Sequence, residues 1–219
     1  MKQYDVVALG EILIDFTCAG KNADGKNVYE ENAGGAPANC VSAVAKLGGR
    51  GAFIGMTGYD SFGDDVRATL SALGVDISAM RRTHAQHTTL AFVSLDARGE
   101  RTFSFCRNPG ADTLLAPEDL DGALLSAARI LHVGSLSLTD EPSKSATLAA
   151  IRAVKAAGGL VSYDPNYRAA LWGGRNDAQS EMQSLLSCAD VVKVSEEELP
   201  LLLGADVTPE AGAEALLAR

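Results

Sequence analysis

The chain of 219 residues carries 28 acidic and 19 basic residues, which gives a formal net charge of −9 and a pI near 4.8. This charge has the wrong sign for a surface that neutralises nucleic-acid phosphates, so nucleic acid is not an expected partner. No apolar run approaches the ~20 residues of a membrane span, and the first one is too short for a signal peptide. We therefore expect a globular protein of the cytoplasm without membrane contact.

Strand-like and helix-like segments alternate along the chain. Tyr4–Leu9 and Ile12–Phe16 read as strands, and a helix is predicted over Pro37–Leu47 because apolar residues recur there at helical spacing. The same order repeats, with strands predicted at Ala52–Met56, Arg129–Val133, Leu160–Tyr163 and Val191–Val194 and helices at Phe62–Leu73, Ser143–Ala157 and Ala178–Cys188. Strands separated by helices pair in parallel, so we predict a doubly wound α/β fold with helices on both faces of a mostly parallel sheet.

Two segments break this order. Residues 17–33 are polar and rich in Gly and Asn, while Thr88–Leu95 and Arg101–Arg107 form a predicted hairpin around Asp96–Gly99. We predict that 14–33 and 87–108 form a small β lid over the ligand crevice, inserted in an α/β domain that spans 1–219. A plain surface hairpin is the alternative. A last helix begins near Thr208 and runs to Arg219, so we expect the sheet to continue beyond this residue.

Candidate ligand-binding residues lie in the first 40 positions. Gly34 and Gly35 directly precede a helix, where glycine lets the backbone approach a ligand and the helix start supplies amide donors, although a tight turn explains the pair as well. Asn39 in the same helix could bind a sugar hydroxyl or face solvent. Asp15 interrupts an apolar strand, where a carboxylate needs partners, so we favour a polyhydroxylated ligand over a structural hydrogen bond.

Two later strand ends carry further polar residues. Asp164, Asn166 and Arg168 alternate after one strand, and Arg168 could hold phosphate oxygens while the other two serve a nucleotide or a metal-bound water. A simple Asp-Pro turn is the alternative. Lys193 and Glu198 follow the next strand and suit a magnesium nucleotide, although acids at a helix start also complement the helix dipole.

Taken in order, these segments resemble the ribokinase-like (PfkB) carbohydrate kinase family over essentially the whole chain, and its fructokinase branch in particular. The matching segments are Gly10–Asp15, Gly34–Asn39, Leu47–Gly49, Gly58–Gly63, Gly99–Phe103, Pro109–Asp112, Asp164–Arg168 and Lys193–Glu198. Each alone is weak evidence, but their number and order are specific.

The resemblance implies transfer of the γ-phosphoryl group of ATP to a primary sugar hydroxyl, with fructose as the leading substrate, in a crevice closed by a β lid. It implies that Asp15, Gly34, Gly35 and Asn39 bind the sugar and that Phe105 covers it. Arg168 would then lie near the transferred phosphate. Asp164, Asn166, Lys193 and Glu198 would serve ATP, with Glu198 reaching Mg²⁺ through water. A monovalent cation such as K⁺ and a homodimer formed through the lid are further expectations. Ribokinase has asparagine at the position of Ser195, so the resemblance does not extend to the exact metal-water arrangement.

The family's catalytic Gly-Ala-Gly-Asp run, which contains the aspartate base, does not occur in the sequence. We expect the base beyond residue 219 and expect the 219 residues alone to be inactive. Alternatives within the class are an aminoimidazole riboside kinase or a 2-keto-3-deoxygluconate kinase. A catalytically silent sugar-binding relative is the alternative from another class. A dinucleotide-binding oxidoreductase is disfavoured because the first strand is followed by Gly10-Glu11 rather than by a G-x-G-x-x-G turn.

Overall fold

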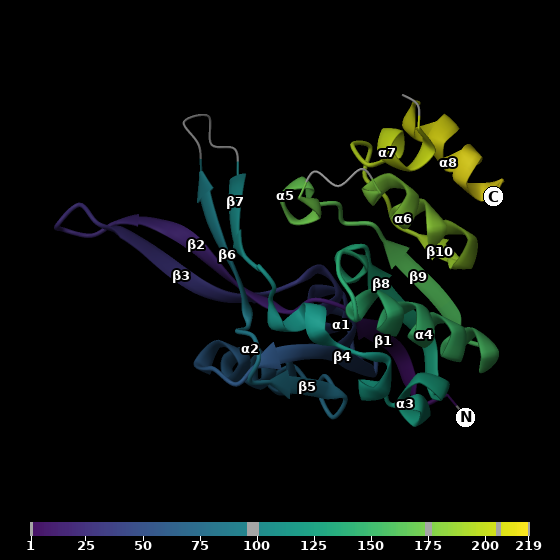
Figure 1. The fold of residues 1–219 in the computed structure, drawn as a ribbon, viewed down its shortest axis with the longest axis horizontal. Coiled ribbons are helices and arrows are strands. Elements are labelled where there is room, and N and C mark those ends of the chain that lie inside the picture. The colour runs from purple at the N-terminus through teal and green to yellow at the C-terminus, as the bar shows by residue number, and fades with distance from the viewer. Residues whose placement is uncertain (1, 96–100, 174–176, 205–206, 219) are drawn as a thin grey trace.

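The computed structural model describes residues 2–95, 101–173, 177–204 and 207–218. These residues form a six-stranded sheet with helices on both faces and a four-stranded sheet that projects from it (Figure 1). The predicted fold class, a doubly wound α/β fold with an additional small β sheet, is confirmed.

The larger sheet has the strand order β10-β9-β8-β1-β4-β5, and each neighbouring pair is parallel. Its strands are β1 (Tyr4–Leu9), β4 (Gly51–Gly58), β5 (Met80–Thr83), β8 (Ala128–Gly134), β9 (Leu160–Asp164) and β10 (Val191–Val192). All eight residues of β4 are buried, as expected for a strand covered on both faces. The short edge strand β5 was not predicted from the sequence.

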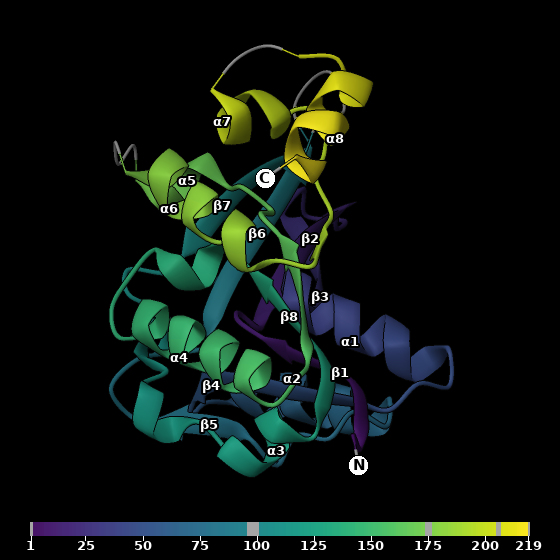
Figure 2. The ribbon, with the colours of Figure 1, turned by 90° about the vertical axis from the view of Figure 1, so that its right-hand side faces the viewer.

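Successive residues of the central strands enter two separate cores. Val7 and Leu9 of β1 belong to the core under α3 (Gly122–Ser126) and α4 (Ser143–Ala156), whereas Ala8 belongs to the core under α1 (Ala36–Lys46) and α2 (Ser61–Ala72). This alternation follows from the two-residue period of a strand. Figure 2 shows α1 and α4 on opposite sides of β8. The carboxyl ends of the strands are thereby left as the open edge of the domain.

The remaining helices are short and lie in the second half of the chain. They are the α-helices α5 (Ala169–Trp172), α6 (Ala178–Ser184), α7 (Leu199–Leu203) and α8 (Pro209–Leu217) and the 3₁₀ helices η1 (Ala111–Leu114), η2 (Pro117–Asp119), η3 (Leu136–Leu138) and η4 (Leu186–Cys188). The helix predicted over Ala178–Cys188 is divided into α6 and η4. At α8 the hydroxyl of Thr208 accepts the Ala211 N–H at 3.3 Å and caps the helix start.

The smaller sheet has the order β3-β2-β6-β7. Its strands are β2 (Leu13–Lys21), β3 (Asn27–Gly34), β6 (Thr89–Leu95) and β7 (Arg101–Cys106). Two antiparallel hairpins, β2–β3 and β6–β7, are joined by a parallel pair between β2 and β6. The turn predicted around Asp96–Gly99 lies outside the described residues, and the division into an α/β domain and an inserted lid stays a prediction.

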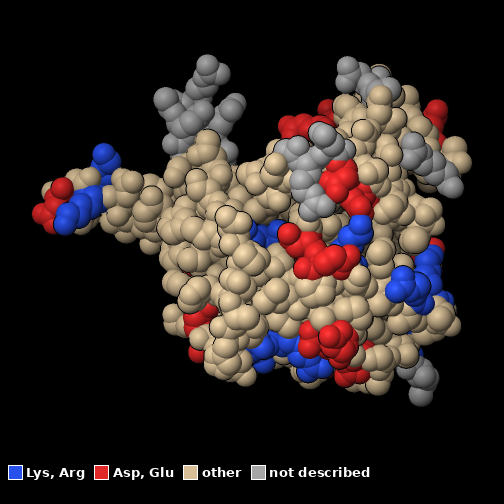
Figure 3. Space-filling view, in the orientation of Figure 1, with Lys and Arg blue, Asp and Glu red and all other residues tan. Residues whose placement is uncertain are grey.

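Aromatic contacts attach this small sheet to the rest of the molecule. Phe16 of β2 stacks on Phe92 of β6 with ring centroids 5.2 Å apart and meets Phe62 of α2 edge-on at 5.6 Å. The far tip of the β2–β3 hairpin instead carries exposed charged side chains of both signs (Figure 3). The sheet is therefore anchored at one end and solvated at the other.

Across the described ranges, no helix has the length and apolar character needed to cross a membrane.

Candidate functional site

A cavity of about 360 Å³ lies between the small sheet and the carboxyl ends of β1, β8 and β9. Its volume falls in the range of small-molecule sites. The lining combines seven polar or charged side chains with apolar and glycine positions: Glu11, Leu13, Asp15, Thr17, Asn32, Gly35, Ala36, Asn39, Val93, Phe103, Phe105, Leu136, Asn166 and Arg168. Six residues predicted from the sequence, namely Asp15, Gly35, Asn39, Phe105, Asn166 and Arg168, come together there.

The Asp15 carboxylate occupies its place because residue 34 is glycine. A Cβ atom on Gly34 would lie 2.2 Å from Oδ2 of Asp15, so a larger residue at position 34 would displace this carboxylate. Gly34 itself does not line the cavity, and its contribution is to leave room for this carboxylate. Burial raises the pKa of Asp15, and the Arg168 guanidinium opposes the rise, so the two side chains face the same space with opposite charges.

Gly35 sets the start of α1 against the connection between β1 and β2. Its φ of 107° lies in the left-handed region, and a Cβ atom there would lie 2.5 Å from the backbone oxygen of Glu11. This close approach brings the first turn of α1 to the cavity wall, with Asn39 exposed toward it. The glycine was predicted to let the backbone approach a ligand; in the structure Gly35 lets it approach the backbone at Glu11, and a contact with a ligand stays a prediction.

Glu11 is a cavity residue that the sequence analysis did not select. It is only 3% exposed, its Oε1 accepts the Ala36 N–H at 3.0 Å, and Oε2 is buried without a partner among the described residues. Burial raises the pKa of Glu11 to about 7, and the charge of Asp112 adds to the rise. The signal that could have found it is the position of a single acid between Gly10 and an apolar run.

Two aromatic rings from β7 line the cavity. Phe103 and Phe105 stack with their centroids 5.9 Å apart, and the guanidinium carbon of Arg168 lies 5.9 Å from the Phe103 ring. Phe105 was predicted as the covering residue, whereas Phe103 was missed. The two are alternate residues of one strand, so the same period that places Phe105 over the cavity places Phe103 there too.

The polar residues at the ends of β9 and β10 form a second group. Lys193 Nζ lies 3.2 Å from Oδ2 of Asp164, and Oδ1 of Asp164 accepts the Asn166 N–H at 3.1 Å. Of these residues Asn166 lines the cavity, while Asp164 and Lys193 lie beside it. The Lys193 side chain is 61% exposed, so this group opens to solvent.

Glu198 connects the two loops of this second group. Its Oε1 accepts the Tyr167 N–H at 2.8 Å and its Oε2 accepts the Ser195 N–H at 2.9 Å. The residue is 7% exposed and does not line the cavity. Both oxygens therefore accept backbone N–H groups, and the contact of Glu198 with Mg²⁺ through water stays a prediction.

Comparison with known proteins gives the same picture. Residues 3–219 match the family described as pfkB family carbohydrate kinase. The chain is similar to probable fructokinase-7 of Arabidopsis thaliana, with 46% identity over 92% of this chain and 59% of the relative, so it spans about three fifths of that protein's length.

Among solved structures, a fructokinase from Xylella fastidiosa superposes with a TM-score of 0.91 at 42% identity, covering 100% of this chain and 67% of that one. A fructokinase from Vibrio cholerae O395, solved in a fructose, ADP and calcium ion bound form, superposes with a TM-score of 0.84 at 36% identity over 98% of this chain and 68% of that one. The parallel sheet, the projecting small sheet and the sequence match over residues 3–219 lead to one conclusion: the chain belongs to the pfkB family of carbohydrate kinases.

Proposed function

We propose that this chain forms the sugar-binding part of an ATP-dependent kinase that phosphorylates a primary hydroxyl of fructose. The observation that carries the proposal is the cavity of about 360 Å³, in which Asp15, Asn39 and Arg168 converge beneath two phenylalanine rings. A carboxylate and an amide suit a polyhydroxylated ligand, and a guanidinium suits phosphate. The Vibrio cholerae fructokinase, which was solved with fructose and ADP, supports this choice of ligands.

Each cavity residue has a distinct task in this proposal. Asp15 accepts hydrogen bonds from two sugar hydroxyls, and Asn39 can both donate to and accept from a third. Phe105 covers the apolar face of the sugar and excludes water from it. Arg168 holds the phosphate oxygens as the phosphoryl group approaches the sugar, and such transfer depends mainly on positioning and on charge stabilisation.

The nucleotide is assigned to the open group beside the cavity. Lys193 is an exposed cation suited to phosphate oxygens, and Asp164 and Asn166 lie at the end of the neighbouring strand β9. In the part of the chain that the structure describes, no three His, Cys, Asp or Glu side chains gather as a ready metal cage. This fits Mg²⁺, which arrives with the nucleotide and keeps several waters, one of which would contact Glu198. When bound, Mg²⁺ neutralises phosphate charge, and K⁺ remains a further proposed ion.

The test of substrate choice is a panel of ligands titrated into residues 1–219 and followed by calorimetry. We expect fructose to bind more tightly than glucose, ribose, 2-keto-3-deoxygluconate or aminoimidazole riboside. If the riboside binds and the sugars do not, the stacked pair of Phe103 and Phe105 recognises a base-like ring, and the fructose assignment fails.

The catalytic base is a separate part of the proposal. Because the 219 residues contain no Gly-Ala-Gly-Asp run, we propose that they bind fructose without phosphorylating it. A coupled assay of ADP release should stay at background, since loss of a base or of an anion hole costs about 10² to 10⁴ in rate for each element. Turnover at a normal enzyme rate would show that the base lies within residues 1–219.

Two further parts concern the surroundings of the protein. We propose a cytoplasmic location, where ATP is abundant, and a homodimer formed through the small sheet. The edge strand β3 supports the dimer, since Val28 and Tyr29 are exposed on it. Sedimentation velocity tests the dimer, and a single monomeric species at high concentration would contradict it.

A further inference from the structure

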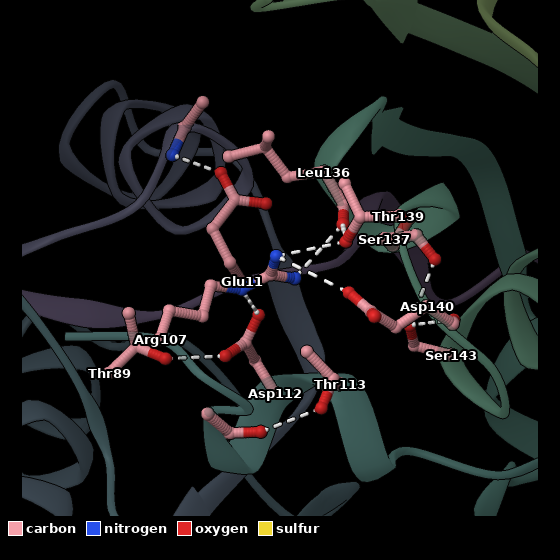
Figure 4. A network of polar contacts seen from close by, with 12 residues as sticks. Glu11, Thr89, Arg107, Asp112, Thr113, Leu136, Ser137, Thr139, Asp140 and Ser143 are labelled. Atoms are coloured by element: carbon pink, nitrogen blue, oxygen red, sulfur yellow. Dashed lines mark hydrogen bonds and ion pairs between the residues drawn. The ribbon is translucent and has the colours of Figure 1, made fainter. Parts of the chain in front are cut away.

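Arg107, which follows β7 directly, is a buried cation at the base of the β6–β7 hairpin. Its side chain is 3% exposed, as is that of its partner Asp112, and Nε of Arg107 lies 2.8 Å from Oδ2 of Asp112 (Figure 4). A buried ion pair is stable only when further hydrogen bonds satisfy both charges. The surroundings of these two side chains therefore decide what the pair does.

The remaining donors of Arg107 bind the segment at η3. Nη1 donates to Oγ1 of Thr139 at 2.9 Å, and Nη2 donates to the backbone oxygen of Leu136 at 3.0 Å. On the other side of the pair, Oδ1 of Asp112 accepts the hydroxyl of Thr89 at 2.6 Å. The pair thereby joins the first residue of β6, the end of β7, η1 and η3.

These connections link two walls of the cavity. The hairpin clamped at Thr89 and Arg107 carries Phe103 and Phe105, and the η3 segment carries Leu136, which also lines the cavity. We propose that Arg107 is a positioning residue for sugar binding, which fixes the covering phenylalanines in register with the Leu136 wall. This inference rests on the proposed sugar-binding function of the cavity.

The geometry favours positioning over simple stabilisation. A buried ion pair contributes little stability beyond a well-packed apolar pair, whereas a planar guanidinium fixes three acceptors in defined directions. The loop at Gly110 packs tightly against the ion pair. A Cβ atom on Gly110 would lie 2.0 Å from the Thr89 hydroxyl and 2.7 Å from Oδ1 of Asp112. The base of the hairpin is thus held in one arrangement.

Two variants separate charge, geometry and stability. Arg107→Lys keeps the cation and loses the planar fork, and the double variant R107M/D112A removes both charges so that neither is left buried alone. Lys144→Met is the matched control, because Lys144 lies 2.6 Å from Glu181 in an ion pair whose two residues do not line the cavity. Fructose dissociation constants from calorimetry and unfolding midpoints are measured for all three.

We expect both Arg107 variants to bind fructose about tenfold more weakly, because the covering side chains must then be ordered on binding. The double variant should unfold within about 4 °C of the wild type, and Lys144→Met should change the fructose affinity by less than about twofold. Hydrogen exchange of the amides of residues 102–107 should rise in R107K, which a role in stability alone would not require.

The outcomes are distinct. Wild-type affinity in both Arg107 variants, with folded protein, overturns the positioning role and leaves the proposed function intact. If the double variant unfolds, R107K alone decides the question, since it keeps the charge beside Asp112. A wild-type chain that binds no fructose overturns the proposed function, and the positioning role falls with it.

Discussion

Two ion pairs flank the candidate site, and they differ in exposure. The side chains of Arg107 and Asp112 are each 3% exposed and bind neighbours on several elements, whereas Lys193 is 61% exposed and pairs with Asp164, which is 14% exposed. A buried, fully bonded pair fixes geometry, while an exposed lysine keeps its freedom and its hydration. The comparison indicates that the side of the site under the phenylalanines is preformed and that the side at β9 and β10 is open to a charged ligand.

The largest effect expected on the buried side concerns Glu11, whose folded pKa of about 7 exceeds its ordinary value of 4.5. Because the folded state favours the protonated form, the contribution of Glu11 to stability is fully present below pH 4.5 and is lost as the pH rises through 7. Glu11→Gln keeps an oxygen for the Ala36 N–H and cannot ionise. The variant should gain roughly 3 kcal/mol over the wild type between pH 4.5 and pH 8, measured by urea unfolding.

The difference between wild type and variant is what matters here, since other titrating groups are common to both. If the difference in unfolding free energy between the variant and the wild type is the same at every pH from 4.5 to 8, Glu11 ionises normally and water reaches its second oxygen.

A smaller effect is expected from Asp15→Asn, which keeps the shape of the side chain and removes its charge. Hydrogen bonds to a charged group contribute about 1.5 to 3 kcal/mol, so fructose should bind about 10 to 100 times more weakly in calorimetry. Asp24→Asn is the matched control, because Asp24 is exposed at the tip of the β2–β3 hairpin and does not line the cavity. Equal affinities in the two variants would remove Asp15 from the sugar contacts.

The smallest effect is expected on the open side. Lys193→Met removes an exposed ion pair with Asp164, and such pairs contribute about 0 to 1 kcal/mol. We expect the unfolding free energy to change by less than about 0.5 kcal/mol and the fructose affinity to stay the same. If Lys193→Met weakened fructose binding as much as is expected for R107K, the buried side at Arg107 and the open side at Lys193 would not differ in their effect on sugar binding.

The central strands of the larger sheet could be predicted because burial on both faces leaves apolar runs, as in β4, where Ala52–Met56 are all buried. The edge strand β5 could not, since it has four residues, Met80–Thr83, with two arginines in the middle. The strand β3 was also hidden in the polar segment 17–33, because its first six residues are exposed and show no apolar alternation.

Site residues could likewise be predicted only where they differ in polarity from their neighbours in the sequence. Asp15 and Asn39 could be selected because each is a polar residue in an apolar segment. Thr17 and Asn32 line the same cavity but lie in the polar segment 17–33, where a further polar residue does not stand out. Phe103 was missed for the opposite reason, since an aromatic residue in a strand is ordinary and only its two-residue spacing from Phe105 marks it.

The parallel pairing of β2 with β6 has a consequence for folding. Leu13 of β2 lies opposite Thr89 of β6. The two hairpins of the small sheet are separated in the chain by α1, β4, α2 and β5, so their pairing closes a long loop. Closing such a loop costs chain entropy before any contact repays it, while the β2–β3 hairpin needs only its own turn. We therefore expect the small sheet to form late in folding, after β1, β4 and β5 of the parallel sheet have brought its two hairpins close together.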